Sequence, residues 1–207
     1  MAHHILYTAR GTCALATHIA LLEAGAEFEL RPLDFNSAEQ RSPAYLALNP
    51  KGRVPALVTP QGVLTETPAL LLYVAQTHPA AGLAPLDDAF LLARMQELQS
   101  YIASTVHVAH AHKHRGARWA DDPAAQDCMR AKVTQNMTDC AVLLEAWLEP
   151  GPWVLGERYC VADAYLYVAA GWMDGDGVDM QRFPQLRAHQ ARVMARQSTQ
   201  VALAQLG

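Results

Sequence analysis

Cys13 is the residue whose type and position most directly indicate chemistry. It follows a predicted strand (residues 4–8) and a turn containing Gly11, and it opens a predicted helix. Backbone N–H groups and the helix dipole at a helix start favour the thiolate, the nucleophilic form of cysteine, so we expect a lowered pKa for Cys13. No second cysteine stands three residues further on, so a resolving thiol must come from elsewhere. On position alone, a small buried hydrophobic residue is an equally good interpretation.

Two residue pairs could bind a ligand with amino-acid groups. Pro55 cannot donate to a sheet, so the Val54-Pro55 corner leaves backbone groups open for a ligand that pairs like an extra strand. Glu66 and Thr67 stand between a predicted strand and helix, where Glu66 could hold an ammonium group and the Thr67 N–H an anion, with Thr67 as the helix cap. The structural alternatives are an ordinary turn and a good helix start.

Four histidines cluster on one predicted helix: His107, His110, His112 and His114. Spacings of three and four residues bring pairs of imidazoles to one face, where they could reach a metal ion. No cysteine or carboxylate lies in the same stretch to complete a ligand set, so we predict no metal site. We expect instead that one histidine points toward the N-terminal part and supports a thiolate.

The elements expected to position these residues change character along the chain. Strands are predicted over residues 4–8, 28–35, 56–59 and 63–66, helices over 13–24, 42–48 and 67–78, and then only helices, over 89–114, 123–148, from about 161 and after 184. Pro32 places the second strand at a sheet edge. We therefore predict an α/β domain at residues 1–79, a linker at 80–88 and an all-helical domain at 89–207.

One further motif has a structural interpretation. The segment from Leu155 to Leu166 opens a helix with Asp163 at its third position. A carboxylate there reaches back to the helix cap. We assign Asp163 no catalytic role.

Composition excludes several classes of protein. The 207 residues carry a net charge of -4 with scattered basic residues, which argues against nucleic-acid binding. No apolar run reaches the roughly 18–20 residues of a membrane helix, and the N-terminus lacks signal-peptide features, so we expect a cytoplasmic protein. Cys128 and Cys140 fall about 18 Å apart on one predicted helix, and the four cysteines do not resemble a disulfide framework.

Three ordered motifs resemble those of the glutathione transferases, most closely the bacterial beta class. They are Asn49 to Leu57 (NPKGRVPAL), Leu64 to Glu66, and Gly156 to Leu166, and the resemblance covers nearly the whole chain. It implies a thioredoxin-like α/β N-terminal domain followed by an all-α helical domain. It also implies glutathione as co-substrate and no metal.

The resemblance further implies roles for individual residues. Pro55 is expected to be cis, the Val54 backbone to pair with the cysteinyl part of glutathione, and Glu66 and Thr67 to hold its γ-glutamyl end. Cys13 and His107 are the predicted catalytic residues, with Cys13 contacting or bonding the glutathione sulfur and His107 facing it. The complete predicted glutathione site consists of Cys13, Lys51, Val54, Pro55, Glu66, Thr67, Ser104 and His107.

The chain departs from the beta-class pattern around this site. The turn at residues 9–12 is about one residue longer than the pattern. The segment from Asp34 to Ser42 has no lysine, where beta-class enzymes usually offer one to glutathione.

The function expected from the resemblance is a detoxifying transferase that conjugates glutathione to small hydrophobic electrophiles, performs thiol–disulfide exchange through Cys13, or both. The alternative is a related binding or regulatory protein with little turnover. The helical domain is expected to line the electrophile pocket, with Tyr101, Trp119, Trp172 and Met173 as candidates. We also expect a homodimer formed through the first two helices of that domain and the N-terminal domain, in agreement with the low charged fraction of 17%.

Overall fold

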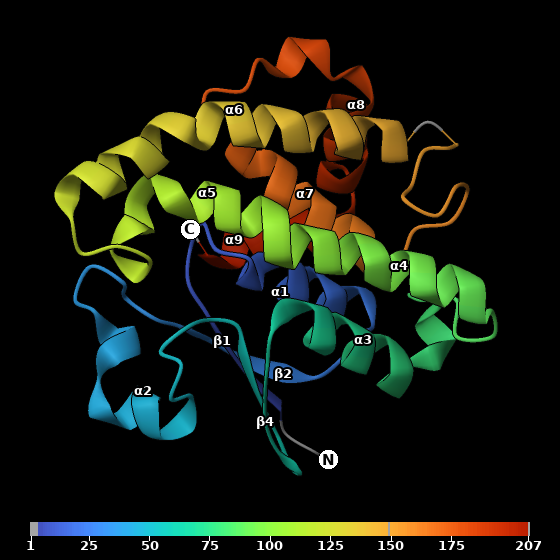
Figure 1. The fold of residues 1–207 in the computed structure, drawn as a ribbon. Helices are drawn as coiled ribbons and strands as arrows, with labels where there is room; N and C mark the ends of the chain where they lie inside the picture. Colours follow the sequence, from blue (N-terminus) through green and yellow to red (C-terminus); the bar gives the residue numbers. More distant parts are fainter. Residues whose placement is uncertain (1–3, 149, 207) are drawn as a thin grey trace.

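The computed structural model describes residues 4–148 and 150–206, which form an N-terminal α/β part and a helical part (Figure 1). Residues 1–3, included in the predicted first domain, lie outside the described residues. The N-terminal part contains β1 (His4–Thr8), α1 (Ala14–Glu23), β2 (Phe28–Pro32), η1 (Glu39–Arg41), α2 (Pro43–Leu48), β3 (Ala56–Thr59), β4 (Gly62–Thr65) and α3 (Thr67–Thr77). After η2 (Pro79–Ala81), the helical part contains α4 (Ala89–Tyr101), η3 (Ile102–Val106), α5 (His107–Arg115), η4 (Gly116–Arg118), α6 (Pro123–Trp147), α7 (Val161–Met173), η5 (Met180–Arg182), α8 (Pro184–Met194) and α9 (Gln197–Leu206).

The four strands form one mixed sheet in the order β2-β1-β3-β4. β1 pairs parallel with β2 and antiparallel with β3, and β3 pairs antiparallel with β4. The predicted edge position of the second strand is confirmed. That strand ends at Pro32, earlier than the predicted 35, because Pro32 pairs with Thr8, the last residue of β1.

The sheet separates two apolar layers. Leu6 and Leu57 are opposite one another on β1 and β3, and both are fully buried in the larger core with α1 and α3. Side chains in a strand alternate between faces, so Ala56 belongs to a smaller cluster on the other face, with Tyr45 of α2. This second layer supports the segment that leads into β3.

α7 is the central helix of the molecule. Its residues from Val161 to Ala170 are all buried, as expected of a helix that is apolar on all sides. It packs against α4 and α8 in the helical part and against α1 and α3 in the N-terminal part, so the larger core is continuous across both. The two parts therefore hold fixed positions around the space between them.

The start of α7 is fixed by the buried carboxylate of Asp163. It accepts hydrogen bonds from the backbone N–H groups of Val154 (2.9 Å) and Cys160 (2.8 Å), and lies 2.9 Å from Nε2 of His189 on α8. The reach back to the cap is as predicted, and Asp163 also ties the preceding loop to α8.

The first long predicted helix contains an irregularity. α4 and α5 are joined through η3, a π-helical segment, and the His107 N–H donates to the carbonyl of Ile102, five residues earlier. A π-segment adds one residue to the turn and rotates the helix beyond it, and such segments are frequent at functional sites. Hydrophobic periodicity could not predict this π-helical segment.

The C-terminal end also differs from the prediction. Two helices, α8 and α9, stand where one helix was predicted after residue 184.

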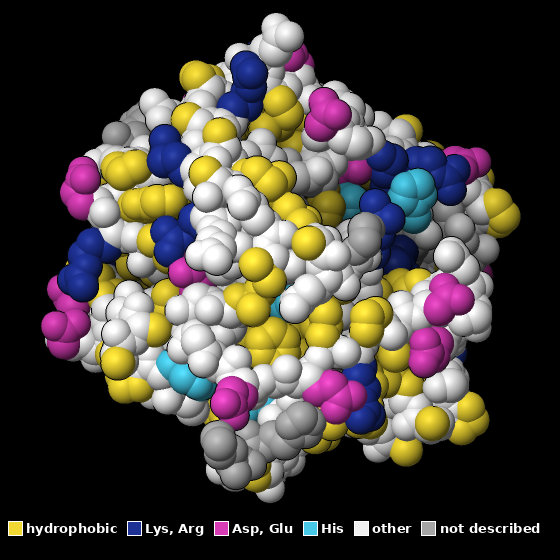
Figure 2. Space-filling model, turned by 180° about the vertical axis from the view of Figure 1, so that it is seen from behind, with side chains coloured by type: hydrophobic (Ala, Val, Ile, Leu, Met, Phe, Trp, Pro, Cys, Tyr) yellow, Lys and Arg dark blue, Asp and Glu magenta, His cyan; other side chains and the backbone are white. Residues whose placement is uncertain are grey.

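The surface seen in Figure 2 mixes apolar and charged side chains over most of its area. Lys, Arg and His side chains gather at the right of that view, the side on which the α5–α6 connection lies. Among the described helices, none is both long and apolar enough to cross a membrane.

Candidate active site

Two adjoining cavities lie where the N-terminal and helical parts face one another. The first, which we call the basic cavity, has a volume of about 180 Å³ and is lined by Arg41, Arg53, Arg115 and Arg118 among others. The second, the Glu66 cavity, has a volume of about 140 Å³. Both are lined by Cys13, Arg53, Val54, His107, Ala111 and Arg118, so the two spaces meet at the Cys13 thiol.

Seven of the eight residues predicted for the glutathione site line the Glu66 cavity. They are Cys13, Lys51, Val54, Pro55, Glu66, Thr67 and His107. Ser104 is the exception: it lines neither cavity, and its exposed hydroxyl donates to the carbonyl of Ser100 at 2.8 Å. The structure thus brings together residues from four segments of the sequence.

Cys13 has the predicted position but not the predicted ionisation. It is the residue before α1 and is only 6% exposed, and its thiol donates to the carbonyl of Val54 at 3.7 Å. Burial raises the pKa of the Cys13 thiol, and this outweighs the hydrogen bond with Thr67, which lowers it. The expected lowering of the pKa was wrong, because loss of hydration exceeds what the helix start supplies. Cys13 is therefore a protonated hydrogen-bond donor at neutral pH.

The loop before β3 holds its backbone against the cavities. The Val54-Pro55 peptide bond is cis, as predicted. The carbonyl of Arg53 accepts hydrogen bonds from the Tyr45 hydroxyl and from the Asn49 side-chain amide, both at 2.7 Å. These two bonds fix the course of the chain where Val54 lines both cavities.

Glu66 and Thr67 stand at the start of α3, but Thr67 does not occupy the cap position predicted for it. The residue that caps the helix is Glu66, while Thr67 is the first helical residue and is buried. Glu66 has a φ of 72°, a left-handed conformation that is strained for a residue with a side chain and is typical of functional sites. Its carboxylate lies 2.6 Å from Nζ of Lys51, which also donates to Thr65 at 2.7 Å.

His107 follows the π-helical segment and lines both cavities beside Cys13. Burial, together with the neighbouring basic groups of His110, Arg118, Arg53 and Arg115, lowers its pKa to about 4. The imidazole is therefore neutral at neutral pH, with one nitrogen available to accept a proton and the other to donate a hydrogen bond.

Neighbouring side chains hold His110 in place. His110 stacks on Trp172, with ring centroids 4.5 Å apart, and its Nδ1 lies 2.6 Å from the buried carboxylate of Asp176. Lys113 lies 3.2 Å from the same carboxylate. Among the described residues there is no group of three His, Cys, Asp or Glu side chains that could hold a metal ion.

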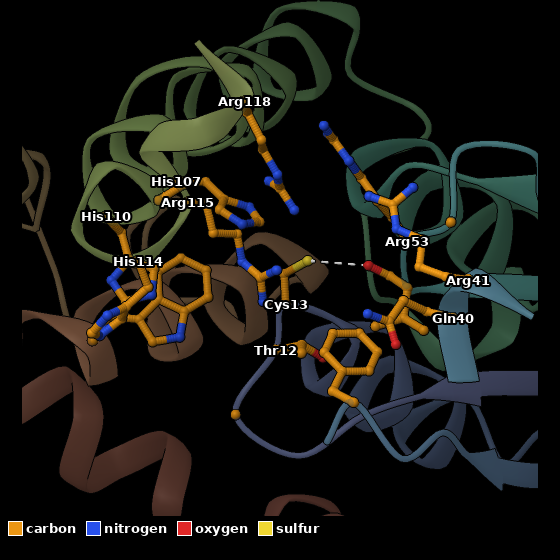
Figure 3. Close-up of a pocket in the computed structure, with 16 residues that line it drawn as sticks. Thr12, Cys13, Gln40, Arg41, Arg53, His107, His110, His114, Arg115 and Arg118 are labelled. Carbon is orange, nitrogen blue, oxygen red and sulfur yellow. Dashed lines mark hydrogen bonds between the residues drawn. The ribbon is translucent and has the colours of Figure 1, made fainter. Parts of the chain in front are cut away.

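The arginines of the basic cavity are the functional candidates that the sequence did not reveal. In Figure 3, Arg115 and Arg118 enter from the helical part and Arg41 and Arg53 from the opposite wall, with Cys13 between them. The backbone of Gly52 makes room for Arg41: with a φ of +59°, its Cα faces Arg41 so closely that an added Cβ would lie 3.0 Å from the guanidinium. The sequence shows only that Arg115 and Arg118 stand close together in the chain, and it does not show that Arg41 and Arg53 lie near them.

Of the four residues predicted to line an electrophile pocket, two line the cavities and two do not. Trp172 lines the basic cavity and Trp119 lines the Glu66 cavity. Tyr101 and Met173 line neither, and Met173 is fully buried in the core.

Comparison with known proteins agrees with this fold. Residues 2–76 match the family model for the glutathione S-transferase N-terminal domain. The chain is 32% identical to a Xanthomonas campestris protein named glutathione S-transferase GST-4.5, over 96% of each chain. A crystal structure of a glutathione transferase homolog from Sulfitobacter, with bound glutathione, is 44% identical over 99% of both chains, with a TM-score of 0.95. A beta-class enzyme structure from Sphingomonas chungbukensis is 33% identical over 98% of both, with a TM-score of 0.85.

These features define an enzyme that joins a thioredoxin-like α/β domain to a helical region around a thiol-binding site. The chain belongs to the glutathione S-transferase family.

Proposed function

We propose that this protein conjugates glutathione to small electrophiles at the two adjoining cavities. The observation that carries the proposal is the meeting of Cys13, Val54, cis-Pro55, Glu66, Thr67 and His107 in one space. The Sulfitobacter homolog, at 44% identity, contains bound glutathione.

Glutathione fits the Glu66 cavity in one orientation. Its γ-glutamyl ammonium pairs with the Glu66 carboxylate, and its α-carboxylate accepts from the N–H of Thr67 at the start of α3. The cysteinyl backbone pairs with that of Val54, which leaves the glycyl carboxylate pointing into the basic cavity, toward Arg41 and Arg53. These arginines do the work of the lysine that is absent between Asp34 and Ser42.

The chemistry then needs the glutathione thiol to lose a proton. The glutathione sulfur lies beside Cys13, where the arginine charges favour its thiolate form. The Cys13 S–H donates a hydrogen bond to this thiolate, and neutral His107 accepts the proton that the glutathione thiol loses. The thiolate sulfur attacks the electrophile and forms a C–S bond, and the leaving group departs with its electron pair. Thiol–disulfide exchange through a Cys13 thiolate has less support, because burial raises the pKa of that thiol.

Replacement of Glu66 tests the binding mode. We expect Glu66→Gln to weaken glutathione binding roughly tenfold to a hundredfold, the loss of a charge-assisted bond worth about 1.5–3 kcal/mol. The measurement is a calorimetric titration with glutathione, paired with the rate of conjugation to a neutral chloronitrobenzene. The matched control is Glu157→Gln, a surface glutamate outside both cavities.

The two readouts separate this proposal from its alternative. Glutathione binding without conjugation favours a binding or regulatory protein, and equal affinity in Glu66→Gln and Glu157→Gln contradicts the binding mode. Conjugation that is lost in Glu66→Gln and retained in Glu157→Gln supports both the conjugation activity and the binding mode.

Finer assignments belong to the same proposal. We assign the protein to the beta class on the pairing of Cys13 with His107, and we place it in the cytoplasm, where its four free cysteines remain reduced. We propose a homodimer in which α4 takes part, since Phe90 at its start is 73% exposed. A monomeric mass at micromolar concentration contradicts the dimer.

A further inference from the structure

The basic cavity carries more positive charge than glutathione requires. Four arginines line it, together with His107, His110 and His114, and no aspartate or glutamate is part of its lining. Within residues 4–148 and 150–206, none of the four arginines forms an ion pair with a carboxylate. Unpaired guanidinium groups that converge on one space are typical of an anion-binding site.

The charges repel one another in the absence of a ligand. Burial, together with the charges of Arg53, Arg115 and Arg41, lowers the pKa of the Arg118 guanidinium to about 10. The arginines are therefore close enough to interact, and an anion between them removes that repulsion.

Glutathione accounts for only part of this charge. In the binding mode above, its α-carboxylate is held at Thr67 and its ammonium at Glu66, so the basic cavity receives one glycyl carboxylate and one thiolate. Four positive charges less these two negative charges leave two. Arg41 and Arg53 come from the N-terminal part, beside the glycyl end, which leaves Arg115 and Arg118 on the helical side for the second substrate.

The remaining walls favour a flat molecule. Phe35 and Trp172 contribute aromatic rings to the lining of the basic cavity, and the Arg115 guanidinium lies 6.0 Å from the Phe35 ring centroid. An aromatic body can stack against such rings, while a carboxylate matches the planar fork of a guanidinium. Cys13 lies between the two pairs of arginines, so the reactive carbon of such a molecule reaches the glutathione sulfur (Figure 3).

We propose that the second substrate is an aromatic electrophile that bears a carboxylate, bound through Arg115 and Arg118. The inference rests on the proposed conjugation activity and deepens it. In the reaction, the glutathione thiolate displaces halide from the ring, the C–S bond forms as the carbon–halogen bond breaks, and the carboxylate remains unchanged.

The test compares a chloronitrobenzoate with the corresponding neutral chloronitrobenzamide, each rate being divided by the spontaneous rate with glutathione. We expect kcat/KM to favour the benzoate by about tenfold or more, the size of one charge-assisted hydrogen bond. In the double variant R115Q/R118Q the ratio of the benzoate rate to the benzamide rate should fall to about one, because any effect of the lost charges on the shared glutathione thiolate lowers both rates equally and cancels from the ratio. Arg187→Gln, an exposed arginine outside both cavities, is the matched control and should change neither rate.

The outcomes are distinguishable from a failure of the proposed function. If R115Q/R118Q lowers kcat/KM equally for both compounds, these arginines act on the thiolate alone, and the inference is overturned. A wild-type preference for the benzamide also overturns it. If neither compound is turned over, the conjugation proposal fails, and calorimetric titration with the two glutathione S-conjugates still decides the inference. Tighter binding of the carboxylate conjugate, lost in R115Q/R118Q, supports it, and equal binding overturns it.

Discussion

At the scale of single residues, the site depends on the protonation of its two central groups. Cys13 and His107 are both in their uncharged forms at neutral pH, because burial raises the pKa of the thiol and lowers that of the imidazole. The arginines then supply the permanent charge. Cys13 is suited to donate a hydrogen bond to a thiolate, and His107 to accept a proton from a thiol.

Thiol labelling tests the state of Cys13. With a thiol-reactive disulfide reagent near neutral pH, we expect Cys128 to react first, because it is exposed whereas Cys13 is buried. Labelling of Cys13 should be slow and should accelerate by about tenfold per pH unit, since only the thiolate reacts. Peptide mapping identifies the site, and Cys128→Ser should remove the fast phase. Fast labelling of Cys13 at neutral pH contradicts the raised pKa.

Acid stability tests the state of His107. Its pKa in the folded protein, about 4, is below the unfolded value of roughly 6.5, so the unfolded chain binds the proton first as the pH falls. The contribution to stability is complete above the unfolded pKa and is lost as the pH falls through about 4. We expect the free energy of unfolding to drop by on the order of 2 kcal/mol more over this window in the wild type than in His107→Gln. The measurement is denaturant unfolding at a series of pH values. Free energies of unfolding that change with pH in parallel in the two proteins contradict the lowered pKa of His107.

The sequence indicates the position of Cys13 but not its environment. Its place at a helix start follows from local pattern, whereas its burial depends on α7 and on Thr67, which are remote in the chain. The arginines were missed for a related reason. Arg41 and Arg53 precede α2 and β3, and they meet Arg115 and Arg118 only in the folded chain.

At the scale of elements, the positions of strands and helices followed from periodicity, and their irregularities did not. The π-helical segment before His107 has the same apolar spacing as an ordinary helix, so the sequence predicts one uninterrupted helix. Thr67-Pro68 is typical of a helix start, but the backbone turns one residue earlier, at Glu66. Both irregularities lie at the cavities, and positions where local sequence preference fails to predict the structure are often functional sites.

Asp163 provides the prediction for this scale. Asp163→Ala removes the acceptor for two backbone N–H groups and His189, leaving buried donors without partners, and we expect the free energy of unfolding to fall by roughly 2–5 kcal/mol. Asp179→Ala is the control, since it removes an exposed cap that accepts from Gln181 and should cost about 1 kcal/mol or less. Equal losses in urea denaturation contradict the central role of Asp163.

At the scale of the whole molecule, the packing of α7 against α1 and α3 holds the helical part and the N-terminal part together around the site. In the proposed binding mode the N-terminal part supplies the surface for glutathione, and the helical part contributes His107, Arg115 and Arg118 to the cavity linings. Neither part contains both halves of the site. The division of the sequence by a linker at residues 80–88 stays a prediction. The continuous core indicates that the two parts unfold together.

The central claim is that the cavities bind glutathione and ionise its thiol. The most direct measurement is the ultraviolet absorbance of the thiolate as a function of pH, recorded as the difference between protein with and without glutathione, in the wild type and in Cys13→Ala. We predict a pKa for the bound thiol at least about one unit below that of a free thiol, near 8.5, with a smaller shift in Cys13→Ala. A bound thiol that titrates like free glutathione, or the absence of any difference signal, contradicts the account.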